Sequence, residues 1–501
     1  MKVQLLDAGQ IKAIHEASLK ILERVGVMVP HAETLRRFAD AGAGVDFEQS
    51  KVRIGPELVM RLLAQATKSF TLYGRDPAKT AAFGRGRRNY NSSAGQALWI
   101  DEPGGVRRFP SLDDVVTAGR LGDALPRINI VGAMADPHEL PVQGRAAEVL
   151  ATLVRQTTKP VHVWLHNRAS AHSIVEIIQA LRGDSRRAAE QPLCYAFLEP
   201  ISPLRFPFDG VDLLYEVARI DMPVSVGPMA QMGLSAPATL SGTMAVENAE
   251  ILAGICIAQL VRPGTAMCYG GVCHAFDMAT TQIVFGGPEQ ALFGVAMTEL
   301  GRSYGLPVYV NVGLTDAKRP DAQAGLESGV TLAMAAAAGA DIFGHMGICG
   351  ADQGASLDTL MLQHEIIDYV EGVMRPVAAD PESIALDVIE SVGAGGSFLA
   401  CDHTVDHFRR ELWFPSLLDR RFYDAWRADG AAALEARCTA QRRELLAAHQ
   451  AAPLDPALDK ALNSIVASDR QPQVAPSPAR HGRPAPTAPS SRACALPPNL
   501  Q

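Results

Sequence analysis

The chain has 501 residues, of which 48% are hydrophobic and 20% are charged. This composition provides ample apolar material for a buried core, and a barrel with additions can reach this length as one domain. The 46 basic and 54 acidic side chains give a formal net charge of −8, which argues against a protein that binds nucleic acids through their phosphates.

The hydropathy pattern predicts a cytoplasmic protein without a membrane span. Every apolar run of eighteen or more residues is interrupted by charges, Gly or Pro, whereas a spanning helix needs about twenty apolar residues. The first residues run directly into an amphipathic pattern and show no signal peptide. Eight Cys are scattered without a Cys-x-x-Cys pair, which argues against a disulfide framework and against structural zinc.

Residues 1–110 are expected to form a helical cap followed by a β-rich cover. Asp7 and Gln10 have the spacing of a capping box before a helical pattern that ends at Gly26. Pro56 begins another predicted helix. Two short strands, 70–73 and 97–100, are separated by a stretch rich in Gly, Arg, Asn and Ser.

Residues 111–403 alternate between apolar runs and helical patterns, which predicts a parallel sheet covered by helices. The expected strands are short, mostly β-branched runs, and several begin with Pro. They comprise 128–134, 161–165, 193–198, 224–229, 266–272, 308–313, 341–346 and, less clearly, 397–401. Seven or eight such units favour a (β/α)8 TIM barrel, and a doubly wound open sheet is the main rival fold.

The C-terminal part is expected to be a helical extension over 404–450, followed by a linker and tail over 451–501. From 471 onwards the chain is rich in Pro, Ala and Ser and has no aromatic residue. Such a segment buries too little apolar area to offset its ordering entropy, so we expect disorder.

Polar residues follow the predicted strands at the positions where a barrel places its reacting groups. The residues just past the strand ends are Asp136, His138, His166, Asn167, Glu199, Gln231, Cys273, His274, Phe276, Thr315, Asp316, Lys318, His345, Cys349, Asp402 and His403. The loop within 310–329, which contains Asp316, Lys318 and Gln323, is the densest of these clusters. A Schiff-base role for Lys318 is disfavoured, because neighbouring acids keep it protonated.

Several segments resemble one known family, the trimethylamine methyltransferase superfamily. These segments are 14–27, Phe-Thr-Leu-Tyr-Gly-Arg-Asp-Pro at 70–77, Ile-Ser-Pro-Leu-Arg-Phe at 201–206, 249–254, 315–325 and Val-Gly-Ala-Gly-Gly-Ser-Phe-Leu at 392–399. The resemblance extends from about residue 5 to 449 in unbroken order. Because the sequence contains only the twenty ordinary residues, it resembles the non-pyrrolysine branch, whose members are similar to glycine betaine:corrinoid methyltransferases.

The resemblance implies a TIM barrel that passes a methyl group from a quaternary amine, or a related onium compound such as a sulfonium, to the Co(I) of a separate corrinoid protein. No cofactor would be bound tightly, because the partner supplies the corrinoid. The resemblance also implies that the protein forms a homo-oligomer. A quaternary nitrogen leaves as a neutral tertiary amine, so the transfer requires neither a general acid nor a metal ion.

Such a substrate requires a dry, aromatic pocket and a group that fixes its carboxylate. The candidate aromatic walls are Tyr90, Trp99, Trp164, Phe197, Phe276, Tyr309 and Phe343. Arg205 and Lys318 are the candidates for binding the carboxylate. Asp316, Gln323, Glu199 and His345 are the candidate catalytic residues, which would orient the methyl group or face the cobalt.

Two other functions remain open on the sequence alone. Four histidines at different strand ends, His138, His166, His274 and His403, suggest a metal-dependent barrel lyase or hydrolase. A betaine-binding protein without catalytic activity would use the same aromatic walls. Bound zinc would support the first alternative, and ligand affinity without methyl transfer would support the second.

Overall fold

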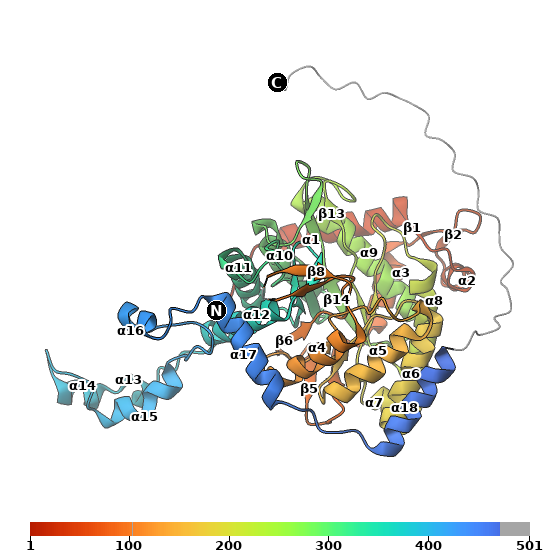
Figure 1. Ribbon diagram of the computed structural model, residues 1–501. Coiled ribbons are helices and arrows are strands. Elements are labelled where there is room, and N and C mark those ends of the chain that lie inside the picture. Colours follow the sequence, from red (N-terminus) through yellow and green to blue (C-terminus); the bar gives the residue numbers. More distant parts are fainter. Residues whose placement is uncertain (103, 471–501) are drawn as a thin grey trace. The chain divides into compact units, whose positions relative to one another are not determined.

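The computed structural model describes residues 1–102 and 104–470. The tail over 471–501, for which the sequence predicts disorder, lies outside the described residues. The described part is an α/β fold in which parallel strands at the centre are surrounded by helices (Figure 1). This confirms the predicted class of fold.

Six parallel strands form the main sheet, in the order β11-β12-β14-β17-β18-β6. They are β6 (Asn89–Ser92), β11 (Ala196–Leu198), β12 (Val224–Val226), β14 (Met267–Gly271), β17 (Val308–Asn311) and β18 (Ile342–Met346). A second parallel pair consists of β9 (Val131–Gly132) and β10 (Val161–His162). Every residue of these strands is buried, as expected for a sheet covered on both faces.

Two contacts connect the pair to the main sheet. A β-bridge joins Asn91 of β6 to Ile130 beside β9. At the other side, the Val161 N–H donates a hydrogen bond of 3.1 Å to the Leu193 carbonyl ahead of β11. The sheet therefore curls around a central core.

One long helix follows each strand, and sequential helices pack against one another around the sheet. They are α4 (Leu112–Ala124), α5 (Val142–Gln156), α6 (Arg168–Arg182), α8 (Phe208–Val217), α9 (Leu240–Val261), α10 (Pro288–Ser303), α11 (Ala322–Ala338) and α12 (Leu357–Met374). Ser111 and Asp114 form a capping box at the start of α4, and α10 begins with Pro288 at a position that tolerates proline.

The predicted strands differ from the observed ones at one end of the series. Residues 397–401, the least clear of the eight, form no strand but a turn that leads into α15 (Asp402–Glu411). They pair with no strand in the part of the chain that the structure describes. Instead β6 supplies the missing strand, from a segment that the sequence analysis assigned to the β-rich cover.

The N-terminal elements cover one outer helix. The predicted capping box of Asp7 and Gln10 begins α1 (Ala8–Lys20), which continues as η1 (Ile21–Val25). Both α1 and α3 (Pro56–Gln65) pack against α9, and α2 (Ala32–Asp40) lies beside a small sheet of β1 (Val27–Met28), β2 (Gly44–Asp46) and β3 (Lys51–Arg53). Among the described residues, α9 alone is long and apolar enough to cross a membrane, and most of it is buried inside the protein.

Two hairpins cover opposite ends of the curled sheet. The hairpin of β4 (Phe70–Tyr73) and β5 (Thr80–Phe83) is bonded to Pro192, ahead of β11, and so lies at the amino ends of the strands. The hairpin of β7 (Trp99–Asp101) and β8 (Val106–Arg108) pairs with β20 (Gly354–Ala355), which follows β18 together with β19 (Ile348–Cys349). A third small sheet contains β13 (Gln231–Met232), which follows β12, and β15 (His274–Asp277) and β16 (Gln282–Val284), which follow β14.

The remaining helices are α7 (Ser185–Glu190), η2 (Ala218–Ile220) and those after α12. In chain order the latter are α13 (Pro381–Ile384), α14 (Leu386–Val392), α15, α16 (Tyr423–Ala428), α17 (Leu434–Ala448) and α18 (Pro456–Asp469). Helix α17 packs against both α12 and α4, and α18 packs against α5 and α6. The stretch expected to be a linker thus contains a packed helix.

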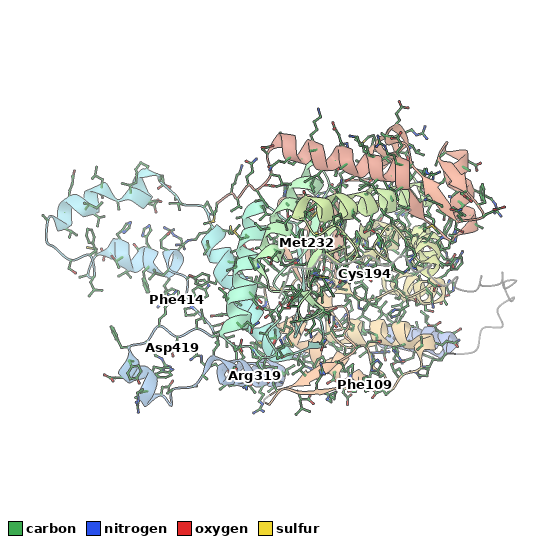
Figure 2. The ribbon with its side chains drawn as sticks, turned by 90° about the horizontal axis from the view of Figure 1, so that it is seen from above. Phe109, Cys194, Met232, Arg319, Phe414 and Asp419 are labelled. Atoms are coloured by element: carbon green, nitrogen blue, oxygen red, sulfur yellow. The ribbon has the colours of Figure 1, made fainter. Side chains whose placement is uncertain are left out.

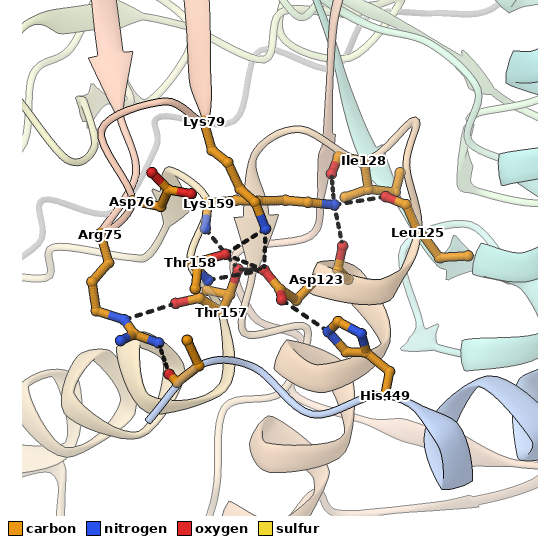
Figure 3. A network of polar contacts seen from close by, with 12 residues as sticks. Arg75, Asp76, Lys79, Asp123, Leu125, Ile128, Thr157, Thr158, Lys159 and His449 are labelled. Atoms are coloured by element: carbon orange, nitrogen blue, oxygen red, sulfur yellow. Dashed lines mark hydrogen bonds and ion pairs between the residues drawn. The ribbon is translucent and has the colours of Figure 1, made fainter. Parts of the chain in front are cut away.

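Asp123, in the last turn of α4, is the centre of a buried polar network (Figure 3). Its carboxylate accepts hydrogen bonds from the Thr157 hydroxyl at 2.8 Å, the Thr158 backbone N–H at 2.9 Å and the His449 ring at 2.9 Å. Burial acts to raise the pKa of Asp123, but these hydrogen bonds outweigh it, and the pKa lies below its usual value. Because His449 follows α17, the network attaches the C-terminal helices to the sheet.

We expect Asp123→Ala to lower the free energy of unfolding by about 3 kcal/mol, because it leaves three hydrogen-bond donors without their acceptor and removes a negative charge that acts on the buried Lys159 ammonium. The Lys159 ammonium donates to three backbone carbonyls, and burial lowers its pKa to about 8 while Asp123 acts to raise it. Denaturant unfolding would measure the loss. Asp113→Ala, at an exposed position in the first turn of α4, is the control and should cost less than about 1 kcal/mol. Equal losses would contradict the role given to Asp123.

Candidate active site

A cavity of about 930 Å³ opens where β10, β11 and β12 end. Its lining residues come mainly from the loops after these strands and from the start of α8. They include Trp164, His166, Phe197, Glu199, Ser202, Pro203, Asp209 and Gln231. The carboxyl ends of parallel strands are where α/β enzymes bind their substrates, so this cavity is the candidate active site.

Four aromatic rings form a closed cycle that reaches the cavity through Trp164 and Phe197. The ring of Trp164 lies 6.1 Å from Phe197, and Phe197 lies 5.3 Å from Tyr309. The cycle closes through His345, whose ring centre is 5.7 Å from Tyr309 and 5.8 Å from Trp164. Trp164 is held in place by a hydrogen bond of 3.0 Å from its indole N–H to the Gly95 carbonyl. We call Trp164, Phe197, Tyr309 and His345 the aromatic cage.

The backbone beside the cage leaves no room for larger side chains. A Cβ atom on Gly227, just after β12, would lie 2.3 Å from the Phe197 ring. Contacts under 3.0 Å require a shift of the neighbouring atoms, so any other residue here would displace Phe197. The glycine thus allows the ring to lie against the strand end.

The two histidines at the cage are uncharged. Burial lowers the pKa of His345 to about 4 and holds the pKa of His162 well below its usual range. The His162 ring stacks on His345 at 5.2 Å and on Tyr195 at 5.1 Å. Its Nδ1 accepts a hydrogen bond of 2.8 Å from the Asn91 amide. The base of the cage therefore carries polar atoms but no positive charge.

Several buried polar atoms around the cage have no hydrogen-bond partner within the described residues. They are Tyr195 Oη, Tyr309 Oη, His162 Nε2, His345 Nδ1 and Asn91 Oδ1. A buried polar group without a partner costs about 1–3 kcal/mol, so such a concentration is unusual in a core that serves stability alone. These atoms are available to water or to a ligand.

Glu199 of the cavity lining and Asp352, which acts on it electrostatically, both have raised pKa values. Glu199 is accessible from the cavity, yet protein surrounds it closely, and this burial, with a smaller contribution from Asp352, raises its pKa to about 7. Asp352, in the loop after β18, also has a pKa raised by burial, to about 6, although it accepts a hydrogen bond of 3.0 Å from the Gln96 amide. Both groups therefore gain negative charge between about pH 5 and 8.

Two buried glutamates on α9 hold the loops that line the cavity. Glu247 accepts hydrogen bonds from the backbone N–H groups of Ala230 and Val272, at 2.9 and 2.7 Å. Glu250 accepts from the Ser202 hydroxyl at 2.7 Å and from the Leu204 N–H. Burial raises the pKa of Glu250 to about 7. One helix thus fixes the loops after β11, β12 and β14.

We expect Glu250→Gln to raise KM about fivefold and to change kcat little. The amide keeps one acceptor oxygen and loses the other, which loosens the cavity loop that contains Ser202 and Pro203. Steady-state kinetics would measure the change. The matched control is Glu299→Gln, because Glu299 also accepts two backbone N–H groups, at 2.8 Å each, but lies outside the cavity lining. An equal rise in KM in both variants would contradict a local effect on the cavity.

Five of the predicted site residues lie together. Trp164, Phe197 and Glu199 line the cavity, and Tyr309 and His345 complete the cage. They come from four different strands or the loops just after them.

Three predicted residues of the loop within 310–329 lie outside the cavity lining. The Asp316 carboxylate accepts hydrogen bonds from the backbone N–H groups of Phe285 and Gly286, both at 3.0 Å, and so fixes the turn before α10. Gln323 is exposed at the start of α11 and donates to Glu327 at 2.8 Å. Lys318 is exposed and does not line the cavity.

Tyr90, Arg205 and Phe276 also lie outside the cavity lining. Tyr90 stacks on Phe343 at 5.0 Å and donates a hydrogen bond of 2.6 Å to Glu371. Arg205 is exposed. Phe276 is half-buried in β15, where it pairs with β16.

Four further residues stand beside the cage or act on Glu199, and they are not among the sequence-predicted candidates. His162 and Tyr195 each stand two residues before a selected aromatic residue, so the alternation of side chains along a strand would have placed them on the same face. Asp352 and Gln96 come from loops that the sequence does not connect, and we find no signal for them.

The four histidines considered as metal ligands are dispersed. His138 packs against Phe109, His274 bonds to Asn311, and His403 stacks on His407 in α15, whereas His166 lines the cavity. Within residues 1–102 and 104–470, no group of three or more His, Cys, Asp or Glu side chains has the arrangement of a metal site.

Comparison with known proteins gives matches along nearly the whole chain. The profile of the trimethylamine methyltransferase (MTTB) family matches residues 1–473. Glycine betaine methyltransferase of Desulfitobacterium hafniense strain Y51 is 32% identical over 468 residues, which cover 93% of this chain and 97% of the relative. Trimethylamine methyltransferase MttB2 of Methanosarcina mazei is 32% identical over 492 residues, covering 93% and 95%.

Among solved structures, the hydroxylamine complex of MtmB superposes with a TM-score of 0.52. The sequence identity is 10%, and the match covers 89% of this chain and 88% of the other. At this level of identity the likeness concerns the fold alone.

Proposed function

This chain belongs to the trimethylamine methyltransferase (MTTB) family and is a methyltransferase, and we propose that it transfers a methyl group from a quaternary amine to the Co(I) of a partner corrinoid protein. The observation that carries this proposal is the aromatic cage beside Glu199. Aromatic faces attract quaternary ammonium ions, which cannot donate hydrogen bonds. The uncharged His345 adds no repulsion.

The proposed transfer makes few demands on the side chains. The bond between carbon and nitrogen breaks, the nitrogen keeps the electron pair, and a neutral tertiary amine leaves. The methyl group forms its new bond with the electron pair of Co(I). No proton moves, which agrees with a site whose histidines are buried and neutral. The protein's tasks are to bind the cation, to orient one methyl group outward and to limit water.

The charges of the lining favour a substrate that is a net cation. Glu199 and Asp209 are acidic, and no Lys or Arg is among the described residues that line the cavity. Arg145, in a smaller adjoining cavity, is already paired with Asp136 at 2.9 Å. These acidic groups would repel the carboxylate of a betaine, whereas choline and tetramethylammonium have no carboxylate and would only be attracted.

A substrate panel tests the proposal. The protein is incubated with free Co(I) cobalamin and, separately, choline, tetramethylammonium, glycine betaine, carnitine, trimethylamine or a dimethylsulfonium compound, and methylcobalamin is followed by absorbance. We expect transfer from at least one quaternary ammonium compound, with a higher kcat/KM for choline or tetramethylammonium than for glycine betaine. If the compounds bind but none of them transfers its methyl group, the proposed reaction is refuted. Preference for glycine betaine would refute the charge argument alone.

We also propose that the eight parallel strands close into a (β/α)8 barrel. The Asn91–Ile130 bridge and the bond from Val161 to Leu193 support this closure. In that barrel β6 is the first strand, so the catalytic domain begins near residue 89, within the segment assigned to the N-terminal cover.

A further inference from the structure

Residues 375–433, called the arm, carry an unusual amount of exposed apolar surface. Its four helices, α13 to α16, make no extensive contact with other elements, and Figure 1 shows α13, α14 and α15 as a group beyond α12. The large apolar side chains that are at least one third exposed are Val377, Ile384, Leu386, Ile389, Phe398, Leu399, Val405, Phe408, Leu412, Phe414, Leu418, Phe422 and Tyr423. Only Ala385 and Leu417 are buried hydrophobic residues of the arm.

The base of the arm is firmly attached. The Glu365 carboxylate on α12 accepts hydrogen bonds from the backbone N–H groups of Ser416, Leu417 and Leu418, each between 3.0 and 3.3 Å. The Trp413 indole N–H donates to Asp368 at 2.6 Å. The direction in which the arm leaves α12 is thus set by contacts at its base, while α13 to α16 make no extensive contact with other elements of residues 1–102 and 104–470.

An apolar groove lies beside that base, on the outer face of α11 and α12. It has a volume of about 330 Å³. Its lining is Gly325, Gly329, Ala333, Leu362, Glu365, Ile366, Tyr369, Val370, Val373, Leu418 and Leu434. Leu326 and Val330, on the exposed side of α11, are 67% and 47% exposed and extend the apolar surface beyond the groove.

We propose that the arm of one copy packs across the α11–α12 groove of a second copy, in a two-fold symmetric dimer. Both surfaces lie on the same chain and meet at Leu418. A two-fold axis therefore buries both arms and both grooves at once, which is the closed arrangement that most homo-oligomers adopt.

The area agrees with a permanent interface. Phe398, Phe414, Phe422 and Tyr423 are 45%, 55%, 91% and 65% exposed, equivalent to about two and a half free rings, or about 500 Å². The nine aliphatic or less exposed side chains of the arm bring the total into the range of the roughly 800 Å² per partner that a stable interface buries. A transient partner would meet a smaller and more polar surface, so the apolar character favours a second copy over the corrinoid protein.

Molar mass in solution tests the arm. Light scattering after gel filtration at micromolar concentration should give twice the mass of the chain, or an even multiple, for the native protein. Phe414→Asp should halve that mass. The matched control is Phe47→Asp, because Phe47 is also 55% exposed but lies in the turn between β2 and β3; this variant should retain the native mass. A native monomer, or equal behaviour of both variants, would overturn the proposal.

Mixing two variants tests whether the arm of one copy packs against the groove of the other, as opposed to some other contact between the copies. Val330→Asp alters the groove side and should also give monomers. When it is mixed with Phe414→Asp, one intact arm meets one intact groove, so a mixed dimer should form (Figure 2 labels Phe414). Failure of the mixture to associate more strongly than either variant alone would overturn the pairing of arm with groove. Circular dichroism spectra equal to the native spectrum would show that both variants are folded.

Discussion

Trp164→Ala is expected to raise KM for a quaternary ammonium substrate about 30-fold and to lower kcat much less. A desolvated contact between a cation and an aromatic ring contributes about 2 kcal/mol, and Trp164 belongs both to the cage and to the cavity lining. Positive charge on nitrogen disappears as the methyl group leaves, so the ring stabilises the bound substrate at least as much as the transition state. Its loss therefore appears mainly in KM. Initial rates of methylcobalamin formation over a range of substrate concentrations would measure both constants.

Two variants make that result specific. Trp164→Phe keeps an aromatic face and should retain a KM within about threefold of the native value. Trp413→Ala removes a tryptophan at the base of the arm, remote from the cavity lining, and should leave KM unchanged. If Trp164→Ala bound and methylated as the native protein does, the substrate would have to lie elsewhere, and the cage would lose its assigned role.

The strands of the sheet were predictable wherever a strand is built from β-branched and apolar residues. The runs that contain Val161, Val224 and Val308 all became strands. The strand over 89–92, Asn-Tyr-Asn-Ser, escaped detection because it is polar in composition, although it is buried and Asn89 and Ser92 are hydrogen-bonded inside the protein. Asn89 donates to the Ala82 carbonyl at 2.8 Å, and the Ser92 hydroxyl accepts the Gly132 N–H at 2.8 Å. A buried polar strand has the composition of a loop, so periodicity cannot identify it.

Position at a strand end brings some candidate residues to the cavity. Phe197 and Trp164 are two of the seven aromatic residues proposed as pocket walls, and both line the cavity; their role in binding stays a prediction. Asp316 satisfies the same rule, yet its two oxygens accept backbone N–H groups of the turn before α10. A carboxylate that fixes a loop and one that faces a substrate have the same sequence signature, so only the three-dimensional contacts separate them.

Glu199→Gln is expected to raise KM about 10-fold at pH 8 and to remove most of its dependence on pH between 6 and 8. The pKa of Glu199 is raised to about 7, so the native carboxylate is largely neutral at pH 6 and largely charged at pH 8. A charged carboxylate attracts a cationic substrate, and KM should therefore fall as pH rises through 7. Water in the open cavity screens this attraction, which keeps the expected effect near 10-fold. The pH profile of KM for choline would show it.

The second cavity acid and a neutral competitor decide whether Glu199 acts through its charge. Asp209→Asn changes another acidic residue of the same lining and should preserve the inflection near pH 7. An uncharged isostere of choline, with carbon in place of nitrogen, should inhibit equally well at pH 6 and pH 8, because it has no charge for the carboxylate to attract. An inflection that survives Glu199→Gln, or that also appears with the neutral inhibitor, would assign the pH dependence to another group. In the first case Asp352, with a pKa of about 6, is the next group to replace.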